Sequence, residues 1–184
     1  MLIPLLSAML LFAPPDQAKS DSIPALSVAG QATPLVLTTG LLHQLPHRHA
    51  AIPANEHEPA SSFDGVPLRA LLTRAGVPEG KAIRGEYLCW VVTVEAADGY
   101  KVVFTLAEID PMFSPREVIL ADARDGKALR ESEGPLRLVV PDEKRPARWI
   151  RQITHISVGP VCQSTKNPAA HEGHGGSAPG AGQR

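Results

Sequence analysis

From residue 23 onward the chain consists of short apolar runs separated by proline, glycine and asparagine. Apolar runs of this length, bounded by turn-forming residues, are typical of β-strands joined by tight connections. The first two runs are Leu26–Gly30 and Pro34–Thr38, and the last two are Leu136–Val140 and Trp149–Val158. With the runs between them, the pattern predicts about eight strands.

Two Asp-Gly pairs stand between apolar runs, at residues 98–99 and 125–126. Aspartate and glycine both tolerate positive φ, so each pair predicts the tight turn of a β-hairpin. The stretch His47–Phe63 is polar and contains two prolines. We interpret it as two edge strands joined by a loop, because proline is accepted in a strand only at the edge of a sheet.

Two short helices are also predicted. Leu68, Leu71 and Leu72 recur at helical spacing. Pro67 suits the first helical position, and Gly76 suits the left-handed backbone conformation that commonly ends a helix. Together they predict a helix over Pro67–Ala75. A second helix is expected to begin at Thr38 or Thr39, whose hydroxyl can accept from the first free amides, and to end before Pro46.

Because the strands come mostly in hairpins and do not alternate with long helices, the predicted fold class is α+β, with a mixed, mainly antiparallel sheet. We expect the helix Pro67–Ala75 to pack on a sheet that includes Tyr87–Ala96 and Leu136–Val140. The size of the chain fits a single domain, which we place at residues 22–160.

Both ends of the chain differ from this domain. Residues 1–20 contain the apolar run Leu2–Phe12, which is too short to span a bilayer but suits the core of a signal peptide. We therefore expect a periplasmic or secreted protein without a stable membrane span; a miscalled start codon and a buried first helix are the alternatives. Residues 161–184 are poor in apolar side chains and are predicted to form a disordered tail.

The charge of the chain excludes some partners. Its formal net charge is −1 at pH 7, whereas proteins that bind nucleic acid or an anionic membrane need a strong basic excess. The sequence also lacks a GxSxG motif, a phosphate-binding glycine loop and a CxxC pair. These absences argue against a hydrolase, a nucleotide cofactor and dithiol redox chemistry.

Three stretches carry a resemblance to a known family: FDGVPLRALLTRAGV (Phe63–Val77), ADGYKVVFTLAEID (Ala97–Asp110) and GPLRLVVPDEKRPARWIRQI (Gly134–Ile153). In order and spacing they resemble the signatures of the oxidoreductase molybdopterin-binding domain, the fold of the sulfite oxidases. The resemblance covers roughly residues 24–158, and the chain looks like the short exported members of that family.

The resemblance implies a molybdopterin cofactor whose molybdenum is held by a cysteine thiolate just upstream of the helix that matches Pro67–Ala75. The upstream stretch His47–Ser62 contains no cysteine, and neither Cys89 nor Cys162 matches the ligand position. Two functions therefore stay open. One is an exported molybdopterin-dependent oxidoreductase with a periplasmic redox partner, and the other is a non-catalytic module that binds another ligand or partner.

A small anionic ligand or cofactor is expected in the basic segment that follows the Leu136–Val140 run. Arginine forks pair well with phosphate oxygens, and the matching segment of the family contributes to pterin binding. The candidate contact residues are Arg137, Lys144, Arg145, Arg148 and Trp149. The alternative is a solvated charged loop, with Trp149 in the core beside Ile150 and Ile153.

Histidines and cysteines supply two further hypotheses. His47 and His49 share one face of the proposed strand, and with His57 on its partner they could bind copper or zinc; an exposed polar hairpin is the alternative. Cys89 and Cys162 form an even pair, which favours a disulfide in an oxidising compartment. Because Cys89 alternates into an apolar run and suits a buried thiol, we predict that it stays free.

Overall fold

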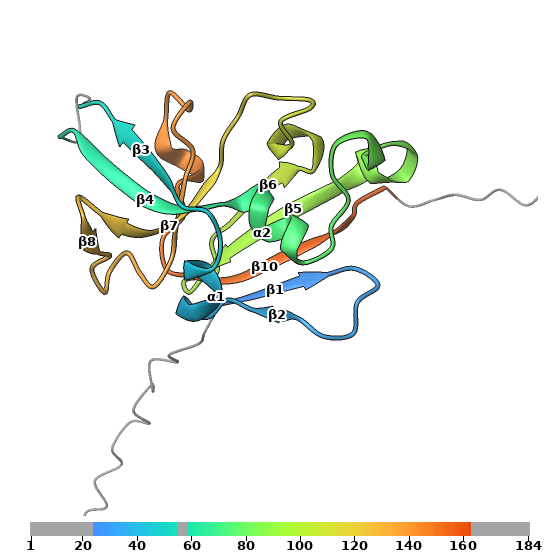
Figure 1. Cartoon of the computed structure of the whole chain (residues 1–184), viewed down its shortest axis with the longest axis horizontal. Helices are drawn as coiled ribbons and strands as arrows, with labels where there is room; N and C mark the ends of the chain where they lie inside the picture. The colour runs from blue at the N-terminus through green and yellow to red at the C-terminus, as the bar shows by residue number, and fades with distance from the viewer. Residues whose placement is uncertain (1–23, 55–58, 163–184) are drawn as a thin grey trace, which may run out of the picture.

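The computed structural model describes residues 24–54 and 59–162. The predicted leader, His57 and the chain after Cys162 lie outside these residues. The described chain forms two five-stranded sheets (Figure 1). The first sheet has the order β2 (Leu35–Val36), β1 (Ala25–Val28), β10 (Ile153–Pro160), β5 (Trp90–Ala96) and β6 (Lys101–Thr105).

The second sheet is formed by the middle of the chain. Its strands are β3 (Arg48–Ile52), β4 (Ser61–Pro67), β7 (Ile119–Arg124) and β8 (Lys127–Ala128), with β9 (Arg137–Val139) also paired to β7. All pairs are antiparallel except β1 with β10, which brings the two ends of the domain side by side. The predicted α+β class with mainly antiparallel sheets is therefore confirmed.

The helices are short. They are α1 (Thr39–His43), α2 (Leu68–Arg74) and the 3-10 turns η1 (Gly80–Ala82), η2 (Gly85–Cys89), η3 (Ala107–Ile109) and η4 (Pro146–Arg148). The hydroxyl of Thr38 accepts from the amide of Leu41 at 3.2 Å, which confirms the predicted start of α1. Gly76 follows α2 at a φ of 78°, a conformation that favours glycine. Within the described residues, no helix is long and apolar enough to cross a membrane.

Both predicted hairpins are present. Asp98 and Gly99 turn β5 into β6, and Asp125 and Gly126 turn β7 into β8, with positive φ at both of the latter residues as a tight hairpin turn requires. The stretch His47–Phe63 contains β3 and the first residues of β4, which pair antiparallel as predicted. Only β3 is an edge strand, however, because β4 pairs with β7 on its other side. β4 and β7 are paired neighbours and approach closely at Gly65. A side chain at this position would collide with the backbone at Leu120 and Ala121, so the close approach requires glycine.

The prediction of one sheet was wrong. The runs Tyr87–Ala96 and Leu136–Val140 fall in different sheets, as β5 and β9, and residues 87–89 belong to a 3-10 turn that precedes β5. Apolar alternation shows which face of a strand is buried but not which strand pairs with it. The described residues contain ten strands where about eight were predicted; the two shortest, β2 and β8, lie in the predicted run Pro34–Thr38 and just after the predicted turn at residues 125–126.

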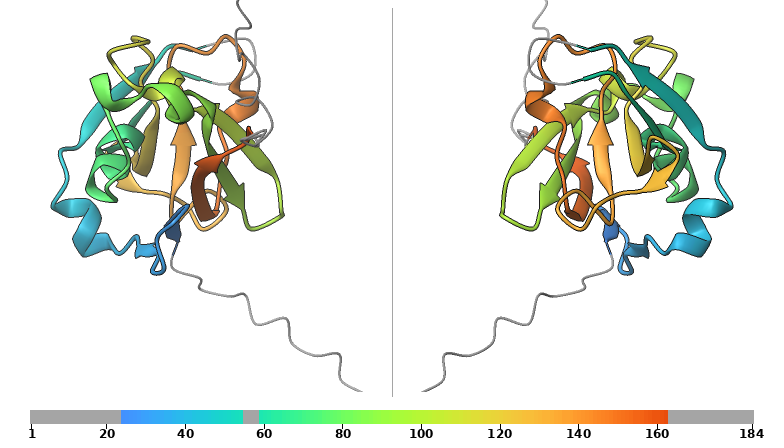
Figure 2. Two further views of the ribbon diagram at one scale, coloured as in Figure 1. Left: turned by 90° about the vertical axis from the view of Figure 1, so that its right-hand side faces the viewer. Right: turned by 90° about the vertical axis from the view of Figure 1, so that its left-hand side faces the viewer.

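The larger hydrophobic core cluster takes its side chains from both sheets and from α2. Figure 2 shows the arrangement of these elements from two sides. Leu68, Leu71 and Leu72 of α2 are fully buried in it. A second, smaller cluster covers the other face of the second sheet and contains Ala50, Phe63, Ile119, Ala121 and Val139. Trp149 packs against both clusters, so the chain around η4 closes one end of the second sheet.

Candidate functional site

The predicted anion-binding segment contains an arginine that is already paired with carboxylates. Arg148, at the end of η4, donates through Nη2 to Oε1 of Glu108 at 3.0 Å and through Nε to Oε1 of Glu143 at 2.6 Å. Its guanidinium also lies 4.2 Å from the centroid of the Phe104 ring. Arg116 joins the same group, with ion pairs to Glu108 and, at 3.0 Å, to Asp142. We call these five charged residues, two arginines and three carboxylates, the balanced cluster.

The titration behaviour of the balanced cluster follows from these contacts. Burial disfavours the charged form of Glu108, but the bond from Arg148 and the charges of Arg148 and Arg116 outweigh it, so the pKa of Glu108 lies below its ordinary value. Burial alone would lower the pKa of Arg148, yet the bonds to Glu108 and Glu143 raise it. Arg148 is thus satisfied inside the protein, and its contact with a ligand stays a prediction.

Lys144 and Arg145 are exposed, and no described ion pair holds either of them. Lys144 lines a small hollow of about 170 Å³ together with Pro53 at the end of β3 and Trp149. The Trp149 indole donates to the carbonyl oxygen of Val140 at 3.1 Å and meets the Phe63 ring edge-on. The hollow therefore joins the segment upstream of α2 to the loop that follows β9.

Arg137 lies on the opposite side of Trp149, in a second group of arginines. Its guanidinium is buried, forms an ion pair with Glu133 and lies 5.1 Å from the Phe63 ring centroid and 5.9 Å from that of Trp149. Arg124 reaches the same Glu133 oxygen at 3.2 Å and also lies over Phe63, at 5.3 Å. Arg137 was predicted as a ligand contact, whereas sequence reasoning missed Arg124 and Glu133.

Strand pairing explains why these residues meet. Ala121 of β7 is paired with Arg137 of β9, and Arg124 of the same strand is paired with Phe63 of β4. Arg124 and Arg137 are 13 positions apart in the sequence, with the Asp125-Gly126 turn between them. No local spacing pattern signals this approach, because it depends on which strands pair.

Two of the three candidate metal-binding histidines, His47 and His49, face a carboxylate. His47 lies 3.2 Å from Asp122, through Nε2, and His49 lies 2.8 Å from Asp64, through Nδ1. Burial opposes protonation of His47, but the bonds to Asp122 and to the Leu45 carbonyl outweigh it and raise the pKa of His47 above 6.5. Among the described residues, no group of three or more histidine, cysteine, aspartate or glutamate side chains could hold a metal ion. Because His57 lies outside them, the three-histidine site stays a prediction.

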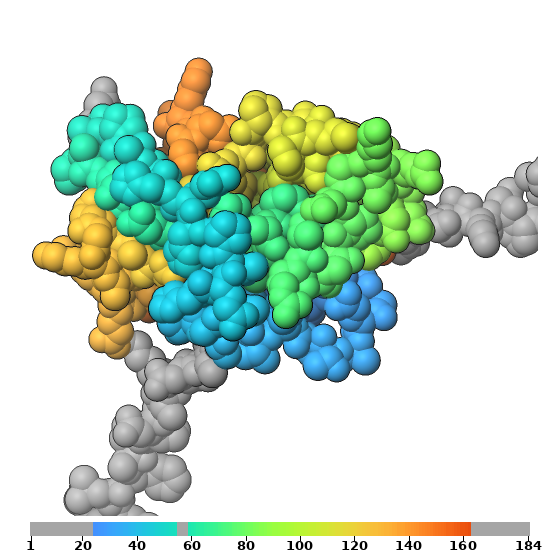
Figure 3. All heavy atoms as spheres, viewed as in Figure 1, coloured from blue at the N-terminus to red at the C-terminus, as the bar shows by residue number. Residues whose placement is uncertain are grey.

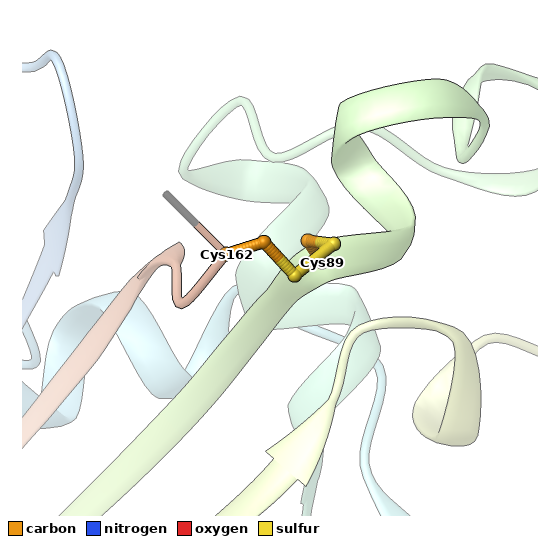
Figure 4. The surroundings of a disulfide bond; sticks show 2 residues. All are labelled: Cys89 and Cys162. Atoms are coloured by element: carbon orange, nitrogen blue, oxygen red, sulfur yellow. A yellow bond between two sulfur atoms is a disulfide. The ribbon is translucent and has the colours of Figure 1, made fainter. Parts of the chain in front are cut away.

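The two cysteines form a disulfide, so the prediction of a free Cys89 thiol was wrong (Figure 4). Cys89 ends η2 just before β5, and Cys162 follows β10, with their Cα atoms 5.5 Å apart. The strands β5 and β10 are antiparallel neighbours paired from Ile153 to Pro160, which brings the two residues together. The amide of Val161 also donates to the carbonyl of Cys89 at 2.9 Å. The domain therefore extends past residue 160, the predicted boundary, to Cys162.

A cavity of about 670 Å³ lies beside α2. Segments 45–48, 67–79 and 109–118 contribute its lining and come together on the face shown in Figure 3. Its most buried arginine, Arg69, donates to the carbonyls of Val77 and Pro78 at 3.1 and 3.2 Å and lies 3.8 Å from Asp110. Burial lowers the pKa of Arg69, although the negative charges of Asp110 and Glu79 act in the opposite direction. This arginine tethers the end of α2 to the following loop.

Comparison with known proteins supports the resemblance. The family model described as oxidoreductase molybdopterin binding domain matches residues 27–164. The match spans both sheets and both cysteines. A comparison with curated proteins finds no relative of significant similarity.

Proposed function

Since the chain belongs to the family of oxidoreductase molybdopterin-binding domains, we propose that it is an exported, non-catalytic member that binds a small anionic ligand without a thiolate-ligated molybdenum. One observation carries this proposal. The chain has two cysteines, and they are bonded to each other beside the first sheet. A disulfide sulfur is not a thiolate, and the thiolate is the form of cysteine that binds metals.

The residues present do not fit a molybdenum held in the manner of the family's catalytic members. The stretch from His47 to Ser62 has no cysteine. Its strand β3 lies in the second sheet, whereas the disulfide links the residue before β5 to the chain after β10, both strands of the first sheet. The hollow at the end of β3, which Lys144 and Trp149 line, measures about 170 Å³. Arg148, expected at a pterin phosphate, is paired with Glu108 and Glu143.

A second function is favoured by one feature. Pro53 and Lys144 meet in that hollow, so the upstream segment and the predicted pterin-binding loop are adjacent, as an oxidoreductase of this family would need. In that case a histidine or solvent would take the place of the thiolate, and a periplasmic redox partner would exchange electrons with the protein. The experiment below separates the two functions.

The deciding experiment is metal and pterin analysis of the full chain, purified after export from a host that makes molybdenum cofactor. We expect substoichiometric molybdenum, no pterin fluorescence and no oxidation or reduction of sulfite or S-oxides. Thiol titration under denaturing conditions should find no free thiol before reduction and two after it. One molybdenum per chain, together with turnover, would reject the proposal and establish the oxidoreductase.

Export is tested in the same preparation. The intact mass of the periplasmic or secreted protein should correspond to a chain that has lost about its first 20 residues, the length of a typical leader. A matched chain that begins at Asp21 should stay in the cytoplasm. Retention of the full chain in the cytoplasm, with residues 1–20 still attached, would contradict export.

A further inference from the structure

Most of the surface that lines the cavity of about 670 Å³ beside α2 is apolar. Its volume falls in the range of about 300–1,000 Å³ that is typical of small-molecule sites, which are mostly apolar with a few polar groups. The cavity shares no lining residue with the hollow at the end of β3. Its apolar lining residues are Leu45, Pro46, Pro67, Ala70, Ile109, Pro111, Pro115 and Val118.

Hydrogen bonds within the protein hold the walls of this cavity. The amide of Leu68 donates to the carbonyl of Val118 at 2.8 Å, which joins the start of α2 to the lining segment 109–118. The carboxylate of Asp110 accepts from the amides of Gly80 and Met112 at 2.9 and 3.0 Å. Four of the apolar lining residues are prolines, whose rings fix φ and which have no amide N–H. The apolar wall is therefore formed without a ligand and offers few hydrogen-bond donors.

Three of the four arginines that line the cavity already have acidic partners. Arg48 pairs with Glu117 at 3.4 Å, and Arg116 pairs with two carboxylates of the balanced cluster. Arg69 lies 3.8 Å from Asp110 and is buried, with its guanidinium bonded to backbone carbonyls. These three guanidiniums are satisfied within the protein.

The fourth lining arginine is Arg74, in the last turn of α2. Its side chain is exposed and makes no ion pair or hydrogen bond with any residue in the described ranges 24–54 and 59–162. The lining carboxylate of Glu79 is engaged elsewhere, because it accepts from the Thr73 hydroxyl at 2.6 Å and its charge acts on Arg69. One guanidinium beside the apolar cavity is thus available to a ligand.

We infer that this cavity binds an apolar monocarboxylate, with its hydrocarbon part against the apolar lining and its carboxylate on the guanidinium of Arg74. Burial of hydrocarbon favours the complex, and the proline-rich lining leaves few polar groups for a more polar ligand. A single carboxylate suits one unpaired arginine, whose planar fork pairs with both carboxylate oxygens. The hydrocarbon is an alkyl chain or an aromatic ring system. The inference does not depend on the proposed function, whose ligand is expected at the basic segment after β9.

The test is calorimetric titration of the full exported chain with octanoate, decanoate and dodecanoate at low ionic strength. We expect one carboxylate per chain. Each added pair of methylene groups should tighten binding about tenfold, in proportion to the hydrocarbon that is buried. Tighter binding of 2-naphthoate than of decanoate would identify the ligand as an aromatic carboxylate, and the reverse would identify an alkyl carboxylate.

Two variants test the role of the guanidinium. Arg74→Gln should weaken decanoate binding about tenfold, the loss of one charge-assisted hydrogen bond, and should leave the binding of neutral decanol within twofold. Arg74→Lys keeps the charge but loses the planar fork, so it should lie between wild type and Arg74→Gln. The matched control is Arg84→Gln, which removes the same charge from an exposed residue that lines none of the cavities described above. It should leave the affinity for decanoate within twofold.

A third variant tests the cavity itself. Ala70 of α2 is half-buried and lines the cavity, so the ring in Ala70→Phe should occupy it and abolish the binding of both decanoate and decanol. Ala70→Leu, with a smaller side chain, should weaken both and serves as a second test if the first variant does not fold.

Three results would overturn the inference. They are absence of decanoate binding up to about 1 mM, decanol binding as tight as that of decanoate, and equal weakening by Arg74→Gln and Arg84→Gln. Each would leave the proposed lack of molybdenum standing, since that is measured by metal analysis.

Discussion

The balanced cluster and a second group of charged residues are built from the same kinds of side chain but differ in charge. The second group, which we call the basic cluster, lines a cavity of about 340 Å³ and consists of Arg124, Arg130, Arg137, Arg151 and Glu133. In the balanced cluster, Arg116 and Arg148 face three carboxylates, so every guanidinium has an acidic partner within the domain. In the basic cluster, four arginines share Glu133, with Asp125 at its edge. The first resembles a structural ion-pair network, whereas the second has the positive charge that suits the small anionic ligand of the proposed function.

The difference shows that a run of arginines in the sequence does not locate a binding site. The densest basic run, Lys144 to Arg148, contributes one arginine to a network that needs no ligand. The 340 Å³ cavity takes its arginines from the end of β7, the loop after β8, the start of β9 and the chain before β10. The balance between arginines and carboxylates in space, and not the number of arginines in a segment, determines whether an anion is attracted.

The largest effect is expected when the basic cluster loses its carboxylate. Glu133→Gln leaves the buried Arg137 without this partner, and breaking a buried ion pair from one side destabilises a protein by about 3–5 kcal/mol. Urea unfolding measures the free-energy change. The control Glu117→Gln removes an exposed carboxylate that pairs with Arg48 and should change stability by about 0.5 kcal/mol or less.

Phosphate sharpens the same comparison. If the cavity of the basic cluster binds an anion, phosphate should stabilise Glu133→Gln more than wild type, because the variant has one more uncompensated positive charge in the cavity. A variant as stable as the control in the absence of phosphate would contradict the assignment of Glu133 as the carboxylate that the cluster depends on.

Loss of the disulfide should be nearly as destabilising but should leave both clusters intact. Cys89 and Cys162 are separated by 73 positions, and a bond across a loop of this length stabilises a domain by about 2–4 kcal/mol. We expect Cys89→Ser/Cys162→Ser to lower the free energy of unfolding by this amount, which a lower thermal midpoint would show. The phosphate affinity should stay at the wild-type value. Loss of phosphate binding at a temperature where the variant is folded would show that the basic cluster depends on the bond.

A smaller effect is expected in the balanced cluster. Glu108→Gln leaves Arg148 with Glu143 and Arg116 with Asp142, so it should cost about 1 kcal/mol at neutral pH. Because the pKa of Glu108 is lowered in the folded protein, its contribution is present above the unfolded pKa and is lost as pH falls through the folded pKa. Urea unfolding from pH 6 to pH 3 should therefore show that the free energy of unfolding falls less with decreasing pH in the variant than in wild type. The same pH dependence in variant and wild type would contradict the stabilising role of ionised Glu108.

The smallest effect lies outside both clusters, at His47. Its raised pKa means that the protonated ring stabilises the fold below the unfolded pKa of 6.5, and that this contribution is lost as pH rises through the folded pKa. His47→Gln should therefore lose more stability at pH 5.5 than at pH 8.5, as measured by urea unfolding. The exposed His43, which has no acidic partner among the described residues, supplies the control His43→Gln. An equal loss at both pH values would exclude the pairing of protonated His47 with Asp122.

Local patterns predicted the elements whose formation depends on neighbours in the sequence. The helix α2 follows from its leucine spacing and Gly76, the start of α1 follows from the Thr38 hydroxyl, and the two Asp-Gly turns follow from their tolerance of positive φ. The three family signatures were also visible in the sequence, and they identify the same family as the match over residues 27–164. These features depend on short-range sterics and hydrogen bonds, which a sequence carries directly.

Tertiary structure alone decided which strands pair and therefore which charges meet. The pairing of β5 with β10 brings Cys89 to Cys162. The pairing of β7 with β9 and β4 brings Arg124 and Arg137 over Phe63, where both pair with Glu133. Alternation of apolar residues gives the buried face of a strand but is the same for every partner that could lie beside it. The sequence determined the family, the elements and the absence of a cysteine upstream of α2, whereas the disulfide and the basic cavity exist because long-range pairing places distant side chains within bonding distance.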